Sequence, residues 1–549
     1  MKHKLLFALF FTALFVISDS VFAQKYWVMF KNKTGTPYSV SAPNAYLGPK
    51  AIARRVNQGI AIDNTDLPVT PSYVSQVAAV SGVTVLYRSK WLNGVVISVT
   101  NTVALNTINT YTFVQSTNRV NRYKLTYPLT DNSNTNTNTN GERTQATSAF
   151  NYGNALNQAQ MIGADCLHGL GYRGQGITIA VMDEGFNDVQ KFDIFDSLFL
   201  QNRLLGTRDF VDGDTTVFTE GPHGANVLST MAGLKPGTII GTAPKANYWL
   251  LRTEDGGSET ISEEYNWIRG AEFADSVGAD ITTTSLGYTT FDLGLNNHTY
   301  SQLDGKTAPM SIAATMASRK GMIVLNAAGN EGQGSWHYIA VPADADSIIT
   351  VGSVDPTRMK SGFSSFGPTA DGRIKPDLCA QGGPAWVCLF PNCSQGSGTS
   401  YATPVLAGGV ACLLQVKKFA KPMQIIGALK ATADSSANPN NRIGWGVPNV
   451  CTAASHSLLS VPSLTKNDNV TIYPNPFTNE LVIMMNNLLA GKTMISITNI
   501  LGQELYSQEL NDPNATAIYL NDLKNYKAGI YFVNIRSAEL NISRKVVKQ

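Results

Sequence analysis

The sequence predicts an α/β fold, a doubly wound parallel sheet in the middle of the chain. Short apolar runs recur there, and each run is continuous rather than alternating. The runs span residues 177–182, 248–251, 281–285, 322–326 and 348–351. Helical patterns separate them, for example over 262–277 and 308–319. Continuous apolar strands joined by helices are typical of a parallel sheet that is covered on both faces.

The bulk composition is typical of a globular chain of several units. The chain has 549 residues, which is too many for one ordinary core, and we expect three or four folded units. Hydrophobic residues make up 43% and charged residues 15%, which argues against a mostly disordered chain. The formal net charge is only +3 and no block of Lys or Arg occurs, so we expect no nucleic-acid partner.

The N-terminus predicts a signal peptide over residues 1–23. Lys2 and Lys4 precede an apolar run at 5–17, and Val21-Phe22-Ala23 then supplies small residues where a signal peptidase cuts. A transmembrane anchor is the alternative, but the run is shorter than the roughly 20 residues that a span needs.

Composition changes divide the rest of the chain. Residues 24–129 read as a small α+β unit, with strands at 26–30, 83–87 and 94–99 and a helix at 51–58. An Asn/Thr-rich segment at 130–149 has almost no apolar residues and is predicted to be a flexible linker. The α/β region covers 150–457, and residues 464–549 alternate in the manner of a small β-sandwich.

The chain contains six cysteines, and export permits disulfides. Cys388 and Cys393 are close together in a Pro/Gly-rich loop and form the most plausible pair. Cys412 falls in an apolar helical stretch, where a small core residue is expected. No pair of C-x-x-C spacings suggests zinc.

Three motifs in the α/β region carry groups suited to acyl transfer. Asp183 ends the 177–182 strand, His223 lies in GPHGANV at a helix start, and Ser400 lies in GSGTSYATP at another helix start. Peptide hydrolysis at neutral pH needs an activated nucleophile, a base and donors for the oxyanion. Carboxyl ends of parallel strands are where such sheets build their sites.

These motifs resemble those of the subtilisin-like proteases, or subtilases, over residues 150–457. GTSYATP is similar to the family's nucleophile motif, AAGNEG to its oxyanion motif, and SSFGPTADGRIKPDL is a further family-like run. The resemblance implies a catalytic triad of Asp183, His223 and Ser400, in the chain order of subtilisin. It further implies that Asn330 binds the oxyanion. Its implied substrate-binding residues are Ser285, Leu286, Gly287 and Gly329.

The resemblance implies a secreted serine endopeptidase that forms an acyl-enzyme on Ser400 and cleaves proteins or peptides. Its chemistry requires no cofactor, and a structural calcium ion is compatible with the family although no ligand set is located. Two positions depart from the family pattern: Glu184 follows the catalytic Asp, and Ala225-Asn226 follows the His-Gly pair. The alternative is a catalytically silent surface adhesin on a protease scaffold, against which the complete set of catalytic residues argues.

The two flanking units carry their own resemblances. Residues 24–129 are similar in βα pattern to the inhibitory propeptides of subtilases, with an unrelated N-terminal domain as the alternative. Residues 464–549 resemble the C-terminal sorting domains of Bacteroidetes type IX secretion, through YPNPF, ILGQ and AGIYFV and a basic end. This implies the type IX machinery as a partner and export across both membranes, followed by release or surface attachment. A carbohydrate-binding or adhesive β-module is the alternative.

Overall fold

The computed structural model describes residues 24–120, 150–294, 296–456, 470–485, 492–500, 502–510, 517–537 and 541–549. The predicted signal peptide, the linker at 130–149 and residues 121–129 of the N-terminal unit lie outside these ranges. The chain forms two compact units, residues 1–459 and 460–549.

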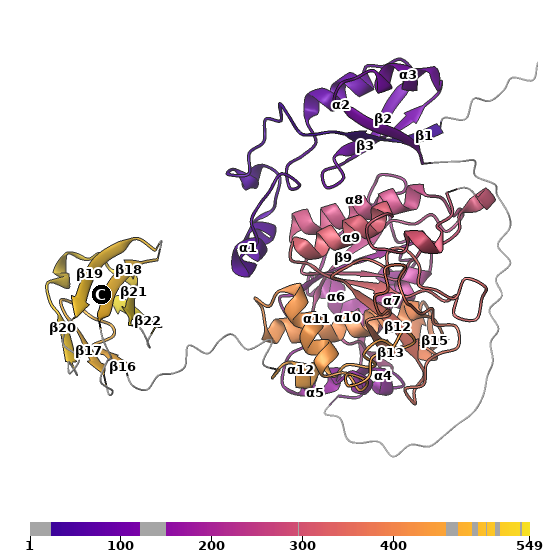
Figure 1. Ribbon diagram of the computed structural model, residues 1–549. Helices are drawn as coiled ribbons and strands as arrows, with labels where there is room; N and C mark the ends of the chain where they lie inside the picture. Colours follow the sequence, from indigo (N-terminus) through magenta and orange to yellow (C-terminus); the bar gives the residue numbers. More distant parts are fainter. Residues whose placement is uncertain are drawn as a thin grey trace, which may run out of the picture. The chain divides into compact units, whose positions relative to one another are not determined.

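A parallel sheet of seven strands is the centre of the first unit, in the order β13-β12-β11-β10-β5-β9-β6 (Figure 1). The predicted doubly wound sheet is therefore confirmed. The five predicted runs become β5 (Thr178–Asp183), β9 (Asn247–Arg252), β10 (Ile281–Thr284), β11 (Ile323–Ala327) and β12 (Ile349–Val354). The sequence did not predict the edge strands β6 (Leu204–Asp209) and β13 (Leu378–Gln381), since β6 is largely half-buried and β13 is very short.

Helices cover both faces of this sheet. Ile179 and Val181 of β5 join one core with α7 (His223–Ala232) and α10 (Thr399–Val416). Ala180 and Met182 join the opposite core with α8 (Ser262–Val277) and α9 (Pro309–Arg319). Alternate residues of one strand thus face different cores, as a sheet between two helix layers requires. By length and composition α10 could cross a membrane, but 83% of it is buried inside the protein. Smaller helices complete the body: α4 (Leu156–Met161), α5 (Ala164–Gly169), α6 (Asp196–Leu200), α11 (Pro422–Ala431) and α12 (Val450–Ala453).

The N-terminal unit is a four-stranded antiparallel sheet in the order β2-β3-β1-β4. Its strands are β1 (Gln24–Phe30), β2 (Val83–Ser89), β3 (Gly94–Val99) and β4 (Val114–Arg119). Helices α2 (Pro71–Ala78) and α3 (Val103–Asn109) share a core with one face of it. Trp27 and Val96, on the other face, pack against α8, where the Trp27 and Tyr265 ring centroids are 5.2 Å apart (Figure 1). A further helix, α1 (Pro49–Gln58), also contacts α8.

The C-terminal unit contains two antiparallel sheets around one shared core. The first has the order β16-β17-β20 and the second β19-β18-β21-β22. Their bounds are β16 (Val470–Tyr473), β17 (Leu481–Met485), β18 (Thr493–Asn499), β19 (Glu504–Leu510), β20 (Ala517–Leu520), β21 (Gly529–Arg536) and β22 (Asn541–Lys548). This is the strand-rich unit that the alternating sequence predicts.

Two disulfides stabilise the first unit. The predicted pair, Cys388–Cys393, joins the hairpin strands β14 (Ala385–Leu389) and β15 (Asn392–Gly396). A second bridge, Cys166–Cys451, joins α5 to α12 across 285 residues of sequence and was not predicted. Cys379 and Cys412 are free and buried, as expected for Cys412.

Candidate active site

The predicted acid and base meet at the C-terminal end of β5. Asp183 is the last residue of that strand and is fully buried, and His223 is the first residue of α7. The His223 Nδ1 and Asp183 Oδ1 atoms are 2.7 Å apart. Gly224 makes this approach feasible, because a Cβ at that position would lie 2.2 Å from the Gly185 carbonyl oxygen. A buried carboxylate on Nδ1 fixes the tautomer that leaves Nε2 as the basic atom.

Glu184, the residue that departs from the family pattern, caps the helix that carries His223. Its Oε1 atom accepts a hydrogen bond from the His223 backbone N–H at 3.0 Å. The first N–H groups of a helix lack partners within it, and a carboxylate there also complements the helix dipole. The departure therefore has a structural role: the residue after Asp183 anchors the start of α7.

Ser400 lies in the first turn of α10 and is 8% exposed. Its hydroxyl donates to the Ser285 carbonyl at 3.3 Å, and the Ser285 hydroxyl donates to the Ser400 carbonyl at 2.8 Å. The ring centroids of His223 and Tyr401 are 6.0 Å apart, which puts the imidazole beside this turn. No hydrogen bond between Ser400 and His223 is formed in the described structure. Such bonds are often long in unliganded enzymes and tighten when substrate binds.

Asn330 is held against the same turn by its carbonyl oxygen. The Oδ1 atom accepts hydrogen bonds from the Thr399 N–H and the Thr399 hydroxyl, both at 2.9 Å. The amide NH₂ is thereby left as the donor available to a ligand. Ser365 supports this turn from below, since its hydroxyl accepts from the Glu331 N–H at 2.9 Å and its own N–H donates to the Gly329 carbonyl at 2.9 Å. Gly329 adopts a φ of +107°, which favours glycine.

One cavity of about 320 Å³ brings the predicted site residues together. Its lining includes His223, Ser285, Leu286, Gly287, Gly329, Asn330 and Ser400, together with several carboxylates. Asp183 lies behind His223 and does not line it. The residues come from segments at or after the carboxyl ends of β5, β10 and β11 and from the first turns of α7 and α10, as expected for an open α/β sheet.

The electrostatic surroundings of His223 favour the imidazolium. Burial alone would lower the pKa of His223, but the Asp183 carboxylate, through its charge and its hydrogen bond, raises this pKa to about 9. The more distant charges of Glu184 and Glu254 act in the same direction. A site that stabilises a protonated base is suited to hold the proton that a nucleophile releases.

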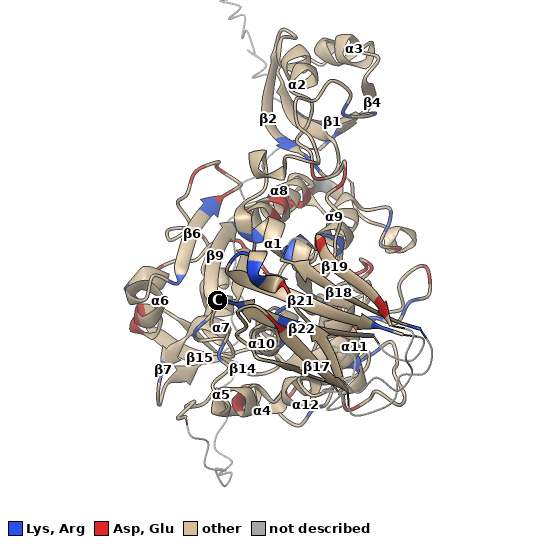
Figure 2. Ribbon diagram, turned by 90° about the vertical axis from the view of Figure 1, so that its left-hand side faces the viewer, with Lys and Arg blue, Asp and Glu red and all other residues tan. Residues whose placement is uncertain are grey.

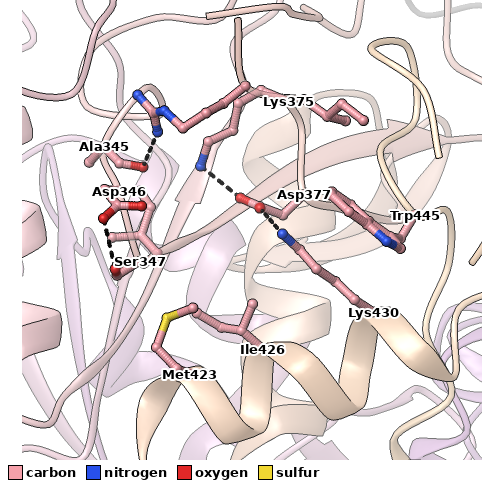
Figure 3. Close-up of a pocket in the computed structure, with 12 residues that line it drawn as sticks. Ala345, Asp346, Ser347, Lys375, Asp377, Met423, Ile426, Lys430 and Trp445 are labelled. Carbon is pink, nitrogen blue, oxygen red and sulfur yellow. Dashed lines mark hydrogen bonds and ion pairs between the residues drawn. The ribbon is translucent and has the colours of Figure 1, made fainter. Parts of the chain in front are cut away.

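A second cavity, of about 270 Å³, lies beside α11, and none of the predicted catalytic residues lines it (Figure 3). The charged side chains in this cavity form ion pairs with one another. Lys375 and Lys430 each place Nζ 2.7 Å from an Asp377 carboxylate oxygen. Lys430 also lies over the Trp445 ring, with Nζ 3.9 Å from the centroid. Because these charges already satisfy one another, we assign this cavity a structural role.

Comparisons with known proteins agree with this geometry. The family model described as the subtilase family matches residues 174–446. Subtilisin NAT of Bacillus subtilis subsp. natto is 31% identical over 299 residues, which cover 53% of this chain and 69% of that protein. Subtilisin of Bacillus pumilus is 31% identical over the same length, covering 53% of this chain and 96% of that protein.

The chain belongs to the subtilase family. A Bacteroidota propeptide domain of peptidase family S8 matches residues 25–139, and a secretion system C-terminal sorting domain matches 471–549. The structure of fervidolysin from Fervidobacterium pennivorans has the same fold, with a TM-score of 0.56 at 17% identity, covering 93% of this chain and 70% of that one. This subtilase is a secreted serine endopeptidase, made with a propeptide and a sorting domain.

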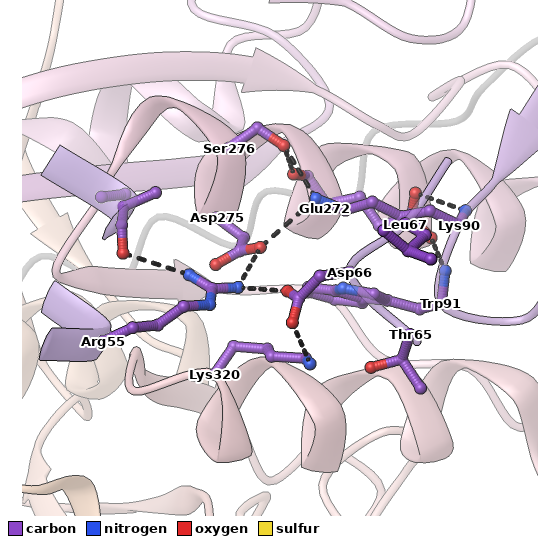
Figure 4. Close-up of polar contacts among 12 residues, drawn as sticks. Arg55, Thr65, Asp66, Leu67, Lys90, Trp91, Glu272, Asp275, Ser276 and Lys320 are labelled. Atoms are coloured by element: carbon purple, nitrogen blue, oxygen red, sulfur yellow. Dashed lines mark hydrogen bonds and ion pairs between the residues drawn. The ribbon is translucent and has the colours of Figure 1, made fainter. Parts of the chain in front are cut away.

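The propeptide of this subtilase is held by buried ion pairs at α1 (Figure 4). Arg55 places Nη2 2.7 Å from Asp66 Oδ1 and 2.9 Å from Asp275 Oδ2, at the C-terminal end of α8. Lys320, just after α9, binds Asp66 at 2.8 Å, and Lys90 lies 3.4 Å from Asp275. Arg54 also binds Asp275, and Figure 2 shows blue segments on α1, the helix that carries both arginines.

Glu272 of α8 adds a second buried contact to the propeptide (Figure 4). Its carboxylate accepts hydrogen bonds from the Ser89 hydroxyl at 2.5 Å and from the Lys90 and Trp91 N–H groups at 3.0 Å. The sequence did not indicate the roles of Glu272 and Asp275, or the supporting roles of Thr399 and Ser365. Thr399 lies in the GTSYATP motif and Ser365 in the SSFGP run, and these two motifs were the available signals.

Proposed function

We propose that Ser400 is the nucleophile, His223 the general base and Asp183 the residue that orients it. The Ser400 oxygen attacks the scissile carbonyl carbon while its proton passes to His223 Nε2. The same proton then goes to the leaving amine as the C–N bond breaks, which leaves an acyl-enzyme. Water then attacks the ester carbon while one of its protons passes to His223. The bond between that carbon and the Ser400 oxygen breaks, the proton on His223 returns to Ser400, and the carboxylic acid product is released.

The observation that carries this proposal is the Asp183–His223 hydrogen bond of 2.7 Å at the wall of the cavity that Ser400 also lines. A buried carboxylate on Nδ1 has little use in an inert scaffold. In this arrangement it stabilises the imidazolium that forms in each half of the reaction.

The proposed oxyanion site consists of the Asn330 amide and the Ser400 backbone N–H. The two Thr399 bonds to Asn330 Oδ1 support this, because they fix the amide while its NH₂ group stays available. Preorganised donors act mainly on charge that develops in the transition state. Ser285, Leu286, Gly287 and Gly329 are proposed to bind the substrate, since they line the same cavity.

The flanking segments have proposed roles in maturation and export. We place the signal peptide at 1–23, the inhibitory propeptide at 24–129, the linker and cleavage region at 130–149, the enzyme at 150–457 and the sorting domain at 464–549. The sorting domain indicates export; passage across both membranes, by the type IX machinery, is the finer proposal. No cofactor is required for this chemistry. Among the described residues, no group of three or more His, Cys, Asp or Glu is placed to hold a metal ion, so a calcium site stays unassigned.

Replacement of the nucleophile tests the catalytic assignment. Ser400→Ala should lower kcat by about 10⁶-fold, the loss known from subtilisin itself, and should abolish labelling by a fluorophosphonate probe. Thr403→Ser, a conservative change one turn along α10, is the control and should keep both properties. Hydrolysis of casein by freshly purified Ser400→Ala at a near-normal rate would show that the triad is wrongly assigned.

Deletion of residues 464–549 tests the role of the tail. The two units have separate cores, so the truncated chain should fold and become active when made in a cytoplasmic host. In a host with type IX secretion, the same truncated chain should accumulate in the periplasm. Normal export of the truncated chain, together with loss of activity in the cytoplasmic host, would make the tail part of the enzyme instead.

A further inference from the structure

Carboxylates form one wall of the active-site cavity. Glu254 and Glu259, from the segment between β9 and α8, line it together with His223 and Ser285. Glu263, in the first turn of α8, is their close neighbour and is 1% exposed. We call Glu254, Glu259 and Glu263 the acidic wall.

Within the described residues, none of the three members of the acidic wall forms an ion pair. Burial, and then the charges of Glu259 and Glu254, raise the pKa of Glu263 to about 10. Burial, and then the charges of Glu259 and Asp183, raise the pKa of Glu254 to about 8, against the lowering effect of His223. Burial, and then the charge of Asp292, raise the pKa of Glu259 to about 7.

Polar atoms beside the acidic wall also lack partners. Glu263 Oε2 and the Tyr288 hydroxyl are buried and have no hydrogen-bond partner in the described part of the chain. Tyr288 follows Gly287 directly, and the charges of all three wall residues act on it. An unpaired buried carboxylate costs several kcal/mol, so a set of such groups next to a substrate cavity points to a ligand that supplies the missing charge and donors.

The ligand that fits is a cationic side chain of a peptide. These carboxylates do not form a metal-binding group, since no such group occurs among the described residues. Peptide is what the adjacent catalytic residues act on, and Lys or Arg would bring both the positive charge and several N–H donors. The wall lines the same cavity as the 285–287 segment, which is proposed to bind the substrate.

We propose that the acidic wall is a subsite that receives a Lys or Arg side chain on the acyl side of the scissile bond, so that this endopeptidase prefers basic peptides. This inference rests on the proposed function, because it assumes that the cavity binds a peptide for hydrolysis. Under this proposal, Glu254, Glu259 and Glu263 determine specificity and take no part in the chemical steps.

The test compares pairs of fluorogenic peptides that differ by one Lys→norleucine replacement at each acyl-side position in turn. We expect the matured enzyme to show, at one position, a kcat/KM about 10- to 100-fold higher for Lys than for norleucine. Glu254→Gln/Glu259→Gln should lose at least about tenfold of this ratio, measured for each enzyme on the plateau of its kcat/KM–pH profile, where the norleucine peptides should be cleaved as before. Glu331→Gln, which removes a carboxylate from the same cavity outside the wall, is the matched control and should keep the ratio.

Active-site titration with a fluorophosphonate probe separates the failure modes. Full labelling and hydrolysis of norleucine peptides with no preference for Lys at any position would overturn the subsite and leave the proposed function intact. Equal loss of the ratio in Glu331→Gln and in the wall variant would also overturn it, because the overall negative charge of the cavity would then be the cause. Absence of labelling and of hydrolysis with every peptide would instead overturn the proposed function.

Discussion

Both ends of α8 carry buried carboxyl groups, but the charges that surround these groups are opposite in sign. Asp275, near the C-terminal end, is fully buried and surrounded by Arg54, Arg55 and Lys90. Burial alone would raise the pKa of Asp275, but these cations lower it to about 2. Glu263, at the N-terminal end, is equally buried and has mainly other carboxylates around it. The chain therefore surrounds with cations the carboxylate that anchors its own propeptide, and leaves the carboxyl groups beside the catalytic cavity without ion-pair partners among the described residues.

The largest effect is expected where a buried pair loses its cation. Arg55→Met, made in the full-length Ser400→Ala chain to prevent self-cleavage, should lower the free energy of unfolding by about 3–5 kcal/mol, because Asp66 and Asp275 stay buried with less compensation. Urea unfolding measures this. Lys235→Met breaks an exposed pair with Asp193 and should cost less than about 1 kcal/mol. Similar losses in both variants would mean that the buried pairs of Arg55 contribute no more to stability than an exposed pair does.

A smaller effect of opposite sign is expected at Glu263. The folded chain raises the pKa of the Glu263 carboxyl from 4.5 to about 10, so it favours the protonated form. The contribution of Glu263 to the free energy of unfolding is therefore complete below pH 4.5 and is lost as pH rises toward about 10. Glu263→Gln removes that dependence, so its stability relative to the parent should increase from pH 5 to pH 9, reaching about 1 kcal/mol or more.

Asp275→Asn is the comparison for Glu263→Gln in the same urea experiments. Because the pKa of Asp275 is lowered to about 2, its contribution is present above the usual value of 3.8 and is lost only as pH falls toward 2. The loss in Asp275→Asn should thus be nearly constant from pH 5 to pH 9. A constant difference for Glu263→Gln as well would mean that the two carboxyls share one kind of environment.

The smallest effect concerns the coupling of the acidic wall to catalysis. The charge of Glu254 helps to raise the pKa of His223, and the base must be neutral to accept a proton from Ser400. Glu254→Gln should move the rising limb of the kcat/KM–pH profile to lower pH, measured with a peptide that has no basic residue. An unchanged profile would indicate that solvent screens this interaction in the matured enzyme.

Local motifs made the candidate site predictable, whereas contacts between distant segments were not predictable. GTSYATP and GPHGANV pointed to Ser400 and His223, which line one cavity in the structure, and the apolar runs predicted the central strands. Cys388 and Cys393 were paired because a short loop keeps them close. Cys166 and Cys451 are 285 residues apart, and no local pattern indicates their approach.

The buried ion pairs were the least predictable feature, because their partners are also far apart in the sequence. Arg54 and Arg55 look like ordinary solvent-facing residues of an amphipathic helix, and only packing against α8 reveals that they are buried. Glu184 appeared to be a departure that weakened the assignment of the triad. Its hydrogen bond to the His223 N–H depends on how the turn after β5 meets α7, which the sequence does not encode in any one motif.

The Cys166–Cys451 bridge makes the catalytic body a covalent ring, because it joins α5 to α12 around the sheet and the helix of Ser400. Closing a loop of 285 residues restricts the unfolded chain by roughly 5 kcal/mol in the chain-entropy model. The ring also matters for a protease that can be cut by other copies of itself. A single nick in a surface loop opens the ring without dividing it, so both fragments stay attached. Only a reductant would convert the nicked molecule into two separable chains.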